Sequence, residues 1–278
     1  ANACTGKKGL KDAEKMSEIV AKELKLKKEE VLVASTGKIG EFLPMAKIEK
    51  GIKQATNELS YEGGEKAAEA ILTTDTAIKQ IVMETDILAR GKGKVKIAGI
   101  AKGSGMISPN LATMLCFITT DACIAPDALE EALKGAVNKS FNQMSIDGDM
   151  STNDSVFILA NGLARNERIK TWRKKKKLRI EDENFSYFCK ALDYLCISLA
   201  KMIARDGEGA TKLIEIKVRG GAFPKEVRRI AKAVAISPLV KTAVAGASPN
   251  WGRIMSALGS AHTHIDTEKV DVYFEEIL

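Results

Sequence analysis

The sequence predicts an α+β protein in which helices pack outside layered sheets. The chain has 278 residues, and 45% of them are hydrophobic, which is enough to bury a sizeable core. Segments with helical periodicity and apolar runs typical of strands occur along the same chain. They do not follow a steady alternation of strand and helix, and this irregular order favours a layered α+β arrangement over a doubly wound parallel sheet.

Helices are predicted wherever apolar residues recur at intervals of three and four. Pro126 and Pro224 each precede such a stretch and suit the first turn of a helix. We expect each apolar stripe to face the core. The stripes lie within residues 13–24, 129–141, 192–203 and 227–234.

Strands are predicted from two kinds of pattern. Residues 214–218 and 270–274 alternate apolar and polar side chains, as half-buried strands do. Continuous apolar runs, typical of fully buried strands, occupy residues 31–33, 95–97, 114–118 and 156–159. The polar stretch 166–184 is the one segment that we interpret as a surface insertion.

The net charge of +7 raises the question of a nucleic-acid partner. Part of the excess is local, in the basic run from Arg173 to Lys177, but acidic residues 181–183 follow directly. A charge block this short is usually a solvated loop, so we expect no nucleic-acid partner, and we assign the run no role.

No apolar run approaches the length that spans a membrane. We therefore expect a cytoplasmic protein without a membrane partner.

Cysteine and histidine usage limits the chemistry. The five cysteines include no Cys-x-x-Cys pair, which is typical of buried thiols in a reducing compartment. The only histidines, His262 and His264, have no cysteine near them, and a metal site would need more ligands, so we expect no metal. A Ser-His-Asp arrangement is also not expected, and a catalytic base must come from another group.

Thr113 stands where a glycine-rich turn leads into an apolar run. The segment reads Lys102-Gly-Ser-Gly-Met-Ile-Ser-Pro-Asn-Leu-Ala-Thr-Met-Leu. By itself, a threonine at the start of a strand is explained by its β-propensity. It would become a nucleophile if the backbone broke between Ala112 and Thr113, because a free α-amine, with a pKa of about 7.7–8.0, could take the hydroxyl proton.

This segment resembles the self-cleavage segment of the ornithine acetyltransferase (glutamate N-acetyltransferase) family. Further motifs agree with the family in the same order: Ala-Asn-Ala-Cys-Thr-Gly at 1–6, Ala-Ser-Thr-Gly at 34–37, Thr-Thr-Asp-Thr at 73–76, Asp-Gly-Asp and Ser-Thr-Asn-Asp within 147–154, Arg-Asp-Gly-Glu-Gly-Ala-Thr-Lys at 205–212, and Pro-Asn-Trp-Gly-Arg at 249–253. The resemblance covers almost the whole chain. It also implies further segments before Ala1 and after Leu278.

The resemblance implies a self-processed enzyme of arginine biosynthesis. Autoproteolysis between Ala112 and Thr113 would give an alpha chain, 1–112, and a beta chain, 113–278, which stay interlocked and assemble as a heterotetramer of two each. The enzyme would move an acetyl group from N2-acetyl-L-ornithine to L-glutamate through an acetyl-Thr113 intermediate, with ping-pong kinetics and no cofactor. Use of acetyl-CoA as a co-substrate stays open. An alternative is an N-terminal-nucleophile aminopeptidase or amidase, which releases the acyl group to water.

The family's site residues fall on specific positions of this chain. The resemblance assigns Thr36 and Gly37 to the oxyanion hole, and it assigns substrate binding to Thr76, Lys102, Glu208 and Thr113. From the residues alone, Thr36 and Gly37 are an ordinary strand-to-loop turn, Lys102 a solvated lysine, and Glu208 part of a helix-ending turn. The pair Gly103 and Gly105 does not indicate a phosphate loop, because no Gly-Lys-Ser/Thr follows.

Overall fold

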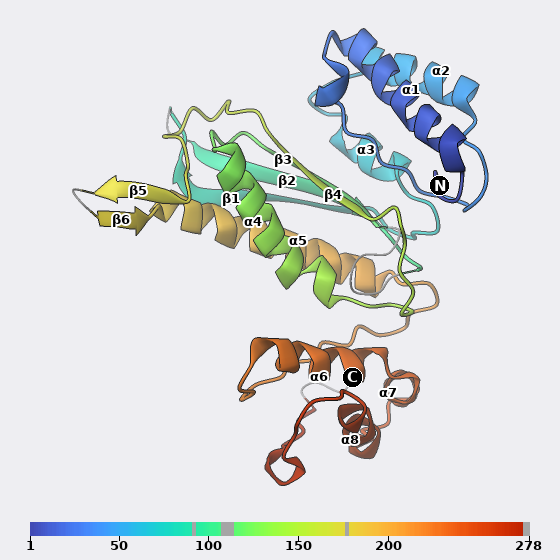
Figure 1. Cartoon of the computed structure of the whole chain (residues 1–278), viewed down its shortest axis with the longest axis vertical. Coiled ribbons are helices and arrows are strands. Elements are labelled where there is room, and N and C mark those ends of the chain that lie inside the picture. Colours follow the sequence, from blue (N-terminus) through green and yellow to red (C-terminus); the bar gives the residue numbers. More distant parts are fainter. Residues whose placement is uncertain (91–92, 107–113, 176–177, 275–278) are drawn as a thin grey trace.

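The predicted α+β class is confirmed: a computed structural model of the chain combines one main sheet with helices (Figure 1). It describes residues 1–90, 93–106, 114–175 and 178–274. The main sheet has the order β1-β2-β3-β4, and its strands are β1 (Lys79–Leu88), β2 (Lys94–Lys102), β3 (Leu115–Thr120) and β4 (Ser155–Ala160). β1, β2 and β3 pair antiparallel, whereas β3 and β4 pair parallel.

Two helices, α4 (Pro126–Lys139) and α5 (Glu183–Arg205), lie along one face of this sheet (Figure 1). The apolar stripe predicted for 192–203 is buried on α5, as expected. Gly99 of β2 faces this helix, and a Cβ atom there would lie 2.9 Å from Leu195 Cδ2. The glycine therefore allows the sheet and α5 to approach closely.

The other helices gather in two groups, one toward each end of the chain (Figure 1). The first contains α1 (Gly6–Leu24), the 3₁₀ turn η1 (Lys28–Glu30), α2 (Met45–Asn57) and α3 (Gly64–Ala70). The second contains α6 (Pro224–Ile236), α7 (Pro238–Ala245), α8 (Trp251–Gly259) and the 3₁₀ turn η3 (Thr267–Lys269). A further 3₁₀ turn, η2 (Phe141–Gln143), follows α4. The stripe predicted within 13–24 is only partly core-facing, since Ala13, Met16 and Val20 are half-buried and Leu24 is exposed.

The strand predictions for 95–97, 114–118 and 156–159 are confirmed by β2, β3 and β4. Those for 31–33, 214–218 and 270–274 are wrong, because none of these segments belongs to a strand ladder in the described part of the chain. Residues with high β-propensity become a strand only where a neighbouring edge supplies hydrogen bonds. In contrast, β1 was not predicted, although Ile81, Met83 and Ile87 alternate along it.

The segment 166–184, expected as a surface insertion, contains a hairpin of β5 (Trp172–Lys175) and β6 (Leu178–Glu181). The interpretation of the basic run as a plain loop is therefore wrong for its paired residues; residues 176–177 lie outside the described part. Leu and Ile alternate with charged residues in β6, and β5 begins with Trp172, a residue of high β-propensity. None of the helices among the described residues has the length and apolar character to cross a bilayer.

Candidate functional site

The predicted nucleophile Thr113 and its neighbour Ala112 lie outside the described residues, but the chain beyond them is fixed at the entry to β3. The amide of Met114 donates a hydrogen bond to Asp154 Oδ1 at 2.8 Å, and the amide of Ser155 donates to the Met114 carbonyl at 3.1 Å. Met114 itself is buried. Hydrogen bonds to the strand next to it thus hold the residue that follows Thr113.

The structure brings Thr36 and Lys102 together. Lys102 is the last residue of β2, and its buried ammonium donates to Thr36 Oγ1 at 3.2 Å. A lysine ammonium can only donate, so the threonine oxygen accepts, and the threonine hydroxyl proton is available to a different acceptor. Burial lowers the pKa of Lys102, and the Asp75 carboxylate, 3.9 Å away, opposes this shift. Lys102 is thus not the solvated lysine that the residues alone would suggest.

The loop that carries Gly37 is anchored to a second motif. The side-chain amide of Asn153 donates to Ser35 at both Oγ (2.8 Å) and the carbonyl (3.1 Å). Gly37 has φ of +122°, in the left-handed region that favours glycine. The Ala-Ser-Thr-Gly and Ser-Thr-Asn-Asp motifs, far apart in sequence, therefore form one unit.

Thr76 lies on an exposed turn just before β1, where solvent reaches it. Its amide donates to Asp206 Oδ2 at 3.0 Å, and its hydroxyl donates to Oδ1 of the same carboxylate. The hydroxyl oxygen keeps lone-pair capacity for a donor from solution. Asp206 is the residue that ends α5.

Glu208 lies against the loop that follows Lys102. A Cβ atom at Gly105 would come within 2.8 Å of the Glu208 carboxyl carbon, so a side chain there would displace this carboxylate. The Glu208 amide donates to the Ser104 carbonyl at 2.8 Å, and the Ser104 hydroxyl donates to the Asp206 carbonyl at 2.7 Å. Glu208 is exposed, so its carboxylate is accessible from solution.

Three charged residues of this region carried no predicted role: Asp75, Lys79 and Asp154. All lie in or beside motifs that the sequence displays, but a motif does not reveal burial. Desolvation raises the pKa of Asp154 to about 7, although hydrogen bonds from the Met114 and Ser151 amides and the charge of Lys102 oppose the shift. Its Oδ2 atom is buried and has no hydrogen-bond partner among the described residues.

The motif at 249–253 is held by contacts among the C-terminal helices. The Asn250 side chain accepts from the Arg253 amide at the start of α8. The Arg253 guanidinium donates to the Leu239 carbonyl and the Thr242 hydroxyl of α7, each at 2.9 Å. These contacts join α7 to α8. Across the described ranges, no group of three or more His, Cys, Asp and Glu side chains could hold a metal ion.

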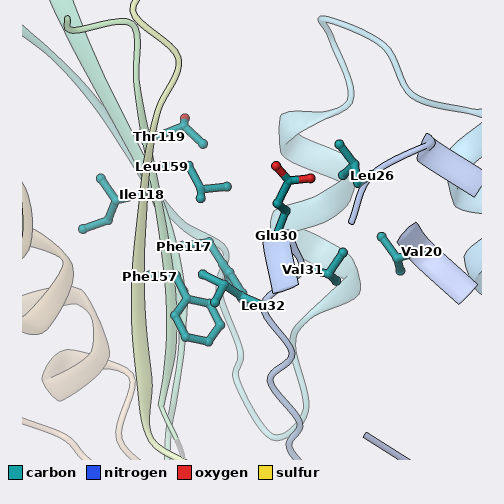
Figure 2. A pocket seen from close by; sticks show the side chains of 10 residues that line it. All are labelled: Val20, Leu26, Glu30, Val31, Leu32, Phe117, Ile118, Thr119, Phe157 and Leu159. Atoms are coloured by element: carbon teal, nitrogen blue, oxygen red, sulfur yellow. The ribbon is translucent and has the colours of Figure 1, made fainter. Parts of the chain in front are cut away.

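An apolar pocket of about 220 Å³ lies elsewhere, between the N-terminal segment and the sheet (Figure 2). Val20, Leu26 and Val31 approach from one side, and Phe117 and Phe157 from the other (Figure 2). None of the candidate site residues lines it. Apart from Glu30, it offers no charged group to an amino-acid ligand, so we take the cluster around Lys102, rather than this pocket, as the candidate site.

Comparison with known proteins identifies similar chains. The chain is 47% identical over 275 residues to the arginine biosynthesis bifunctional protein ArgJ of Caldanaerobacter subterraneus subsp. tengcongensis, covering 99% of this chain and 65% of that protein. It is 50% identical over 273 residues to the protein of the same name from Geobacillus kaustophilus, covering 98% and 63%. The chain thus spans less than two thirds of the length of these relatives.

The fold also has a counterpart among solved structures. A crystal structure of the arginine biosynthesis bifunctional protein ArgJ from Bacillus halodurans matches with a TM-score of 0.50 and 46% sequence identity, over 55% of this chain and 67% of that one. The model of the ArgJ family matches residues 1–278. On this match and these identities, the chain belongs to the ArgJ family.

Proposed function

We propose that the protein containing this chain transfers an acetyl group from N2-acetyl-L-ornithine to L-glutamate, giving L-ornithine and N-acetyl-L-glutamate for arginine biosynthesis. The observation that carries the proposal is the hydrogen bond from Lys102 to Thr36. It joins a cation suited to a carboxylate and a hydroxyl suited to an oxyanion at the end of β2. Membership of the ArgJ family supports the acetyl chemistry.

Thr113 is the proposed nucleophile, after autoproteolysis frees its amino group. The amine takes the hydroxyl proton while the threonine oxygen bonds to the acetyl carbonyl carbon. The negative oxygen that results meets the Thr36 hydroxyl and the Gly37 amide. The bond from the acetyl carbon to the ornithine nitrogen then breaks, and the leaving amine takes the proton from the Thr113 ammonium. Glutamate reverses these steps: its amine attacks the acetyl ester and releases Thr113.

Substrate recognition follows from charge. N2-acetylornithine carries a carboxylate beside the acetylated nitrogen and an ammonium at the far end of its side chain. Lys102 suits the carboxylate, Glu208 suits the ammonium, and Thr76 supplies a hydroxyl beside them. Glutamate shares the carboxylate, so the same lysine serves both halves of the reaction.

The proposal extends to the assembled protein. The alpha and beta chains remain together after cleavage, and two such pairs form a heterotetramer. The enzyme works in the cytoplasm. Because the relatives carry the name bifunctional, we also propose that acetyl-CoA can serve as the acetyl donor. Its thioester would acetylate Thr113 and release the coenzyme A thiol, and the glutamate amine would then take the acetyl group. No cofactor takes part in either reaction.

Mass spectrometry of the full-length protein tests the proposal first. We expect fragments that end at Ala112 and begin at Thr113, and we expect a Thr113→Ala variant to stay uncut and inactive. Steady-state assays should give parallel double-reciprocal lines for the two substrates. An uncut wild-type protein that transfers acetyl groups would contradict the nucleophile assignment, and release of free acetate in place of N-acetylglutamate would favour an amidase.

A further inference from the structure

The structure contains a buried group of three charges beside the candidate site. Lys79, the first residue of β1, is 1% exposed. Its ammonium donates to Asp75 Oδ1 at 2.7 Å, to Asp206 Oδ2 at 2.5 Å and to the Ala77 carbonyl at 3.2 Å. A lysine ammonium has three donors, so all of them are satisfied. We call Asp75, Lys79 and Asp206 the charged bridge.

Each carboxylate of the bridge also holds backbone from another part of the chain. Asp75 accepts from the amide of Gly103 at 2.6 Å, directly after Lys102, and its other oxygen lies 3.9 Å from the Lys102 ammonium. Asp206 accepts from the amide and the hydroxyl of Thr76. The bridge thus joins the turn before β1, the end of β2 and the end of α5.

The two carboxylates of the bridge are held in their ionised forms. Burial by itself would raise the pKa of Asp75, but hydrogen bonds from Lys79 and the Gly103 amide outweigh it and keep the pKa below its usual value. The pKa of Asp206 is likewise lowered: burial opposes the shift, and hydrogen bonds from Lys79 and Thr76 prevail. A buried ion pair of this kind is weak evidence for stability, because desolvation offsets much of the attraction. What it does fix is geometry.

We propose that the charged bridge positions the substrate-binding residues Thr76, Lys102 and Glu208 relative to one another. The Thr76 hydroxyl donates a hydrogen bond to Asp206, and the Lys102 ammonium lies 3.9 Å from Asp75. Glu208 follows Asp206 by two residues in the turn after α5. None of the three bridge residues needs to touch the substrate, so they are positioning residues. The proposal rests on the proposed function, because it takes the same three side chains as the substrate contacts.

The test is the steady-state kinetics of the full-length, processed enzyme with N2-acetyl-L-ornithine at saturating L-glutamate. Asp206→Asn removes one charge and keeps the size of the side chain. We expect the KM for acetylornithine to rise tenfold or more while kcat changes less than threefold. The reason is that substrate binding is weakened, whereas the groups that transfer the acetyl group stay in place. The matched control is Glu215→Gln, which breaks the exposed ion pair of Glu215 with Lys201 on α5 (2.7 Å) and should leave both constants unchanged.

A second variant covers the case in which Asp206→Asn does not fold. Lys79→Met combined with Asp206→Asn removes one charge of each sign, and Asp75 keeps the hydrogen bond from the Gly103 amide. The folded double variant should show the same rise in KM. A normal KM in either folded variant would overturn the inference, and so would failure of both to fold, since the bridge would then serve folding alone. A wild-type enzyme that transfers no acetyl group would instead overturn the proposed function.

Discussion

At the residue scale, the Thr36 hydroxyl oxygen accepts a hydrogen bond from Lys102, which leaves the hydroxyl proton available to another acceptor. In the proposed function, that acceptor is the negative oxygen of the tetrahedral intermediate. Thr36→Val removes the hydroxyl and keeps the shape of the side chain. We expect kcat to fall by about 10²–10³, the loss that follows removal of one oxyanion-hole donor. Steady-state assays check this. Thr56→Val, on exposed α2, is the control and should leave kcat unchanged.

Titration of Asp154 should make the stability of the protein depend on pH. Its folded pKa of about 7 lies above the ordinary value of 3.8, so the folded protein holds the proton more tightly than the unfolded chain does. The stabilisation is fully present below the unfolded pKa and is lost as the pH rises through the folded pKa. Asp154→Asn cannot titrate. We expect the Tm of this variant, relative to wild type, to increase between about pH 4 and pH 8.

Thermal melts of both proteins across this pH range check the prediction. A Tm difference that does not vary with pH would show that Asp154 does not titrate with a raised pKa. The variant keeps an oxygen that can accept the Met114 amide, so the loss of that hydrogen bond does not confuse the comparison.

Individual site residues were predicted from motifs, but their interactions were not. The resemblance selected Thr36, Thr76, Lys102 and Glu208, and the structure places Thr36 beside Lys102 and Glu208 over the loop after Lys102. Asp75 and Lys79 had no predicted role because the sequence does not reveal which charges are buried. The assignments of these residues to substrate and oxyanion stay predictions.

At the element scale, the contact between β2 and α5 depends on Gly99. A Cβ atom there would lie 2.9 Å from Leu195 and 3.0 Å from Leu199. Gly99→Ala should therefore destabilise the protein by about 1–3 kcal/mol, the usual cost of overpacking a core. Urea unfolding monitored by circular dichroism measures this.

The matched control is Gly51→Ala in α2, where an added Cβ would meet no atom within 4 Å. Alanine favours a helix over glycine by about 1 kcal/mol, so this variant should be slightly more stable. If both variants shifted the urea midpoint in the same direction, the contact between Gly99 and α5 would not explain the effect of the added methyl group.

Helices were more predictable than strands for a physical reason. The apolar stripe of α5 is local, so its period is visible in a single stretch of sequence. A strand depends on a partner from elsewhere in the chain. Residues 31–33 and 214–218 have suitable side chains and no ladder, whereas β1 has Lys79 and Thr85 among its buried positions and pairs with β2. Single-sequence patterns do not contain this pairing.

At the scale of the whole molecule, the two hydrophobic clusters found among the described residues differ in size. The larger one joins the main sheet to α4 and α5, while the smaller one centres on Val234, Val240 and Ala257 of the C-terminal helices. Less buried apolar surface leaves a smaller free energy of local opening. We expect backbone amides of α5 to exchange with deuterium more slowly than those of α6 to α8. Hydrogen exchange of the full-length protein measures this, and equal protection would contradict it.

The ladder between β2 and β3 runs from Ile97 opposite Thr120 to Lys102 opposite Leu115. The bond between Ala112 and Thr113 lies in the connection between these two strands. A cut there would leave β2 on one fragment and β3 on the other, still hydrogen-bonded in the same sheet, so native gels, light scattering and circular dichroism would all register an unbroken molecule. The cleavage would become detectable only in detergent or denaturant, when the two strands separate and the fragments come apart.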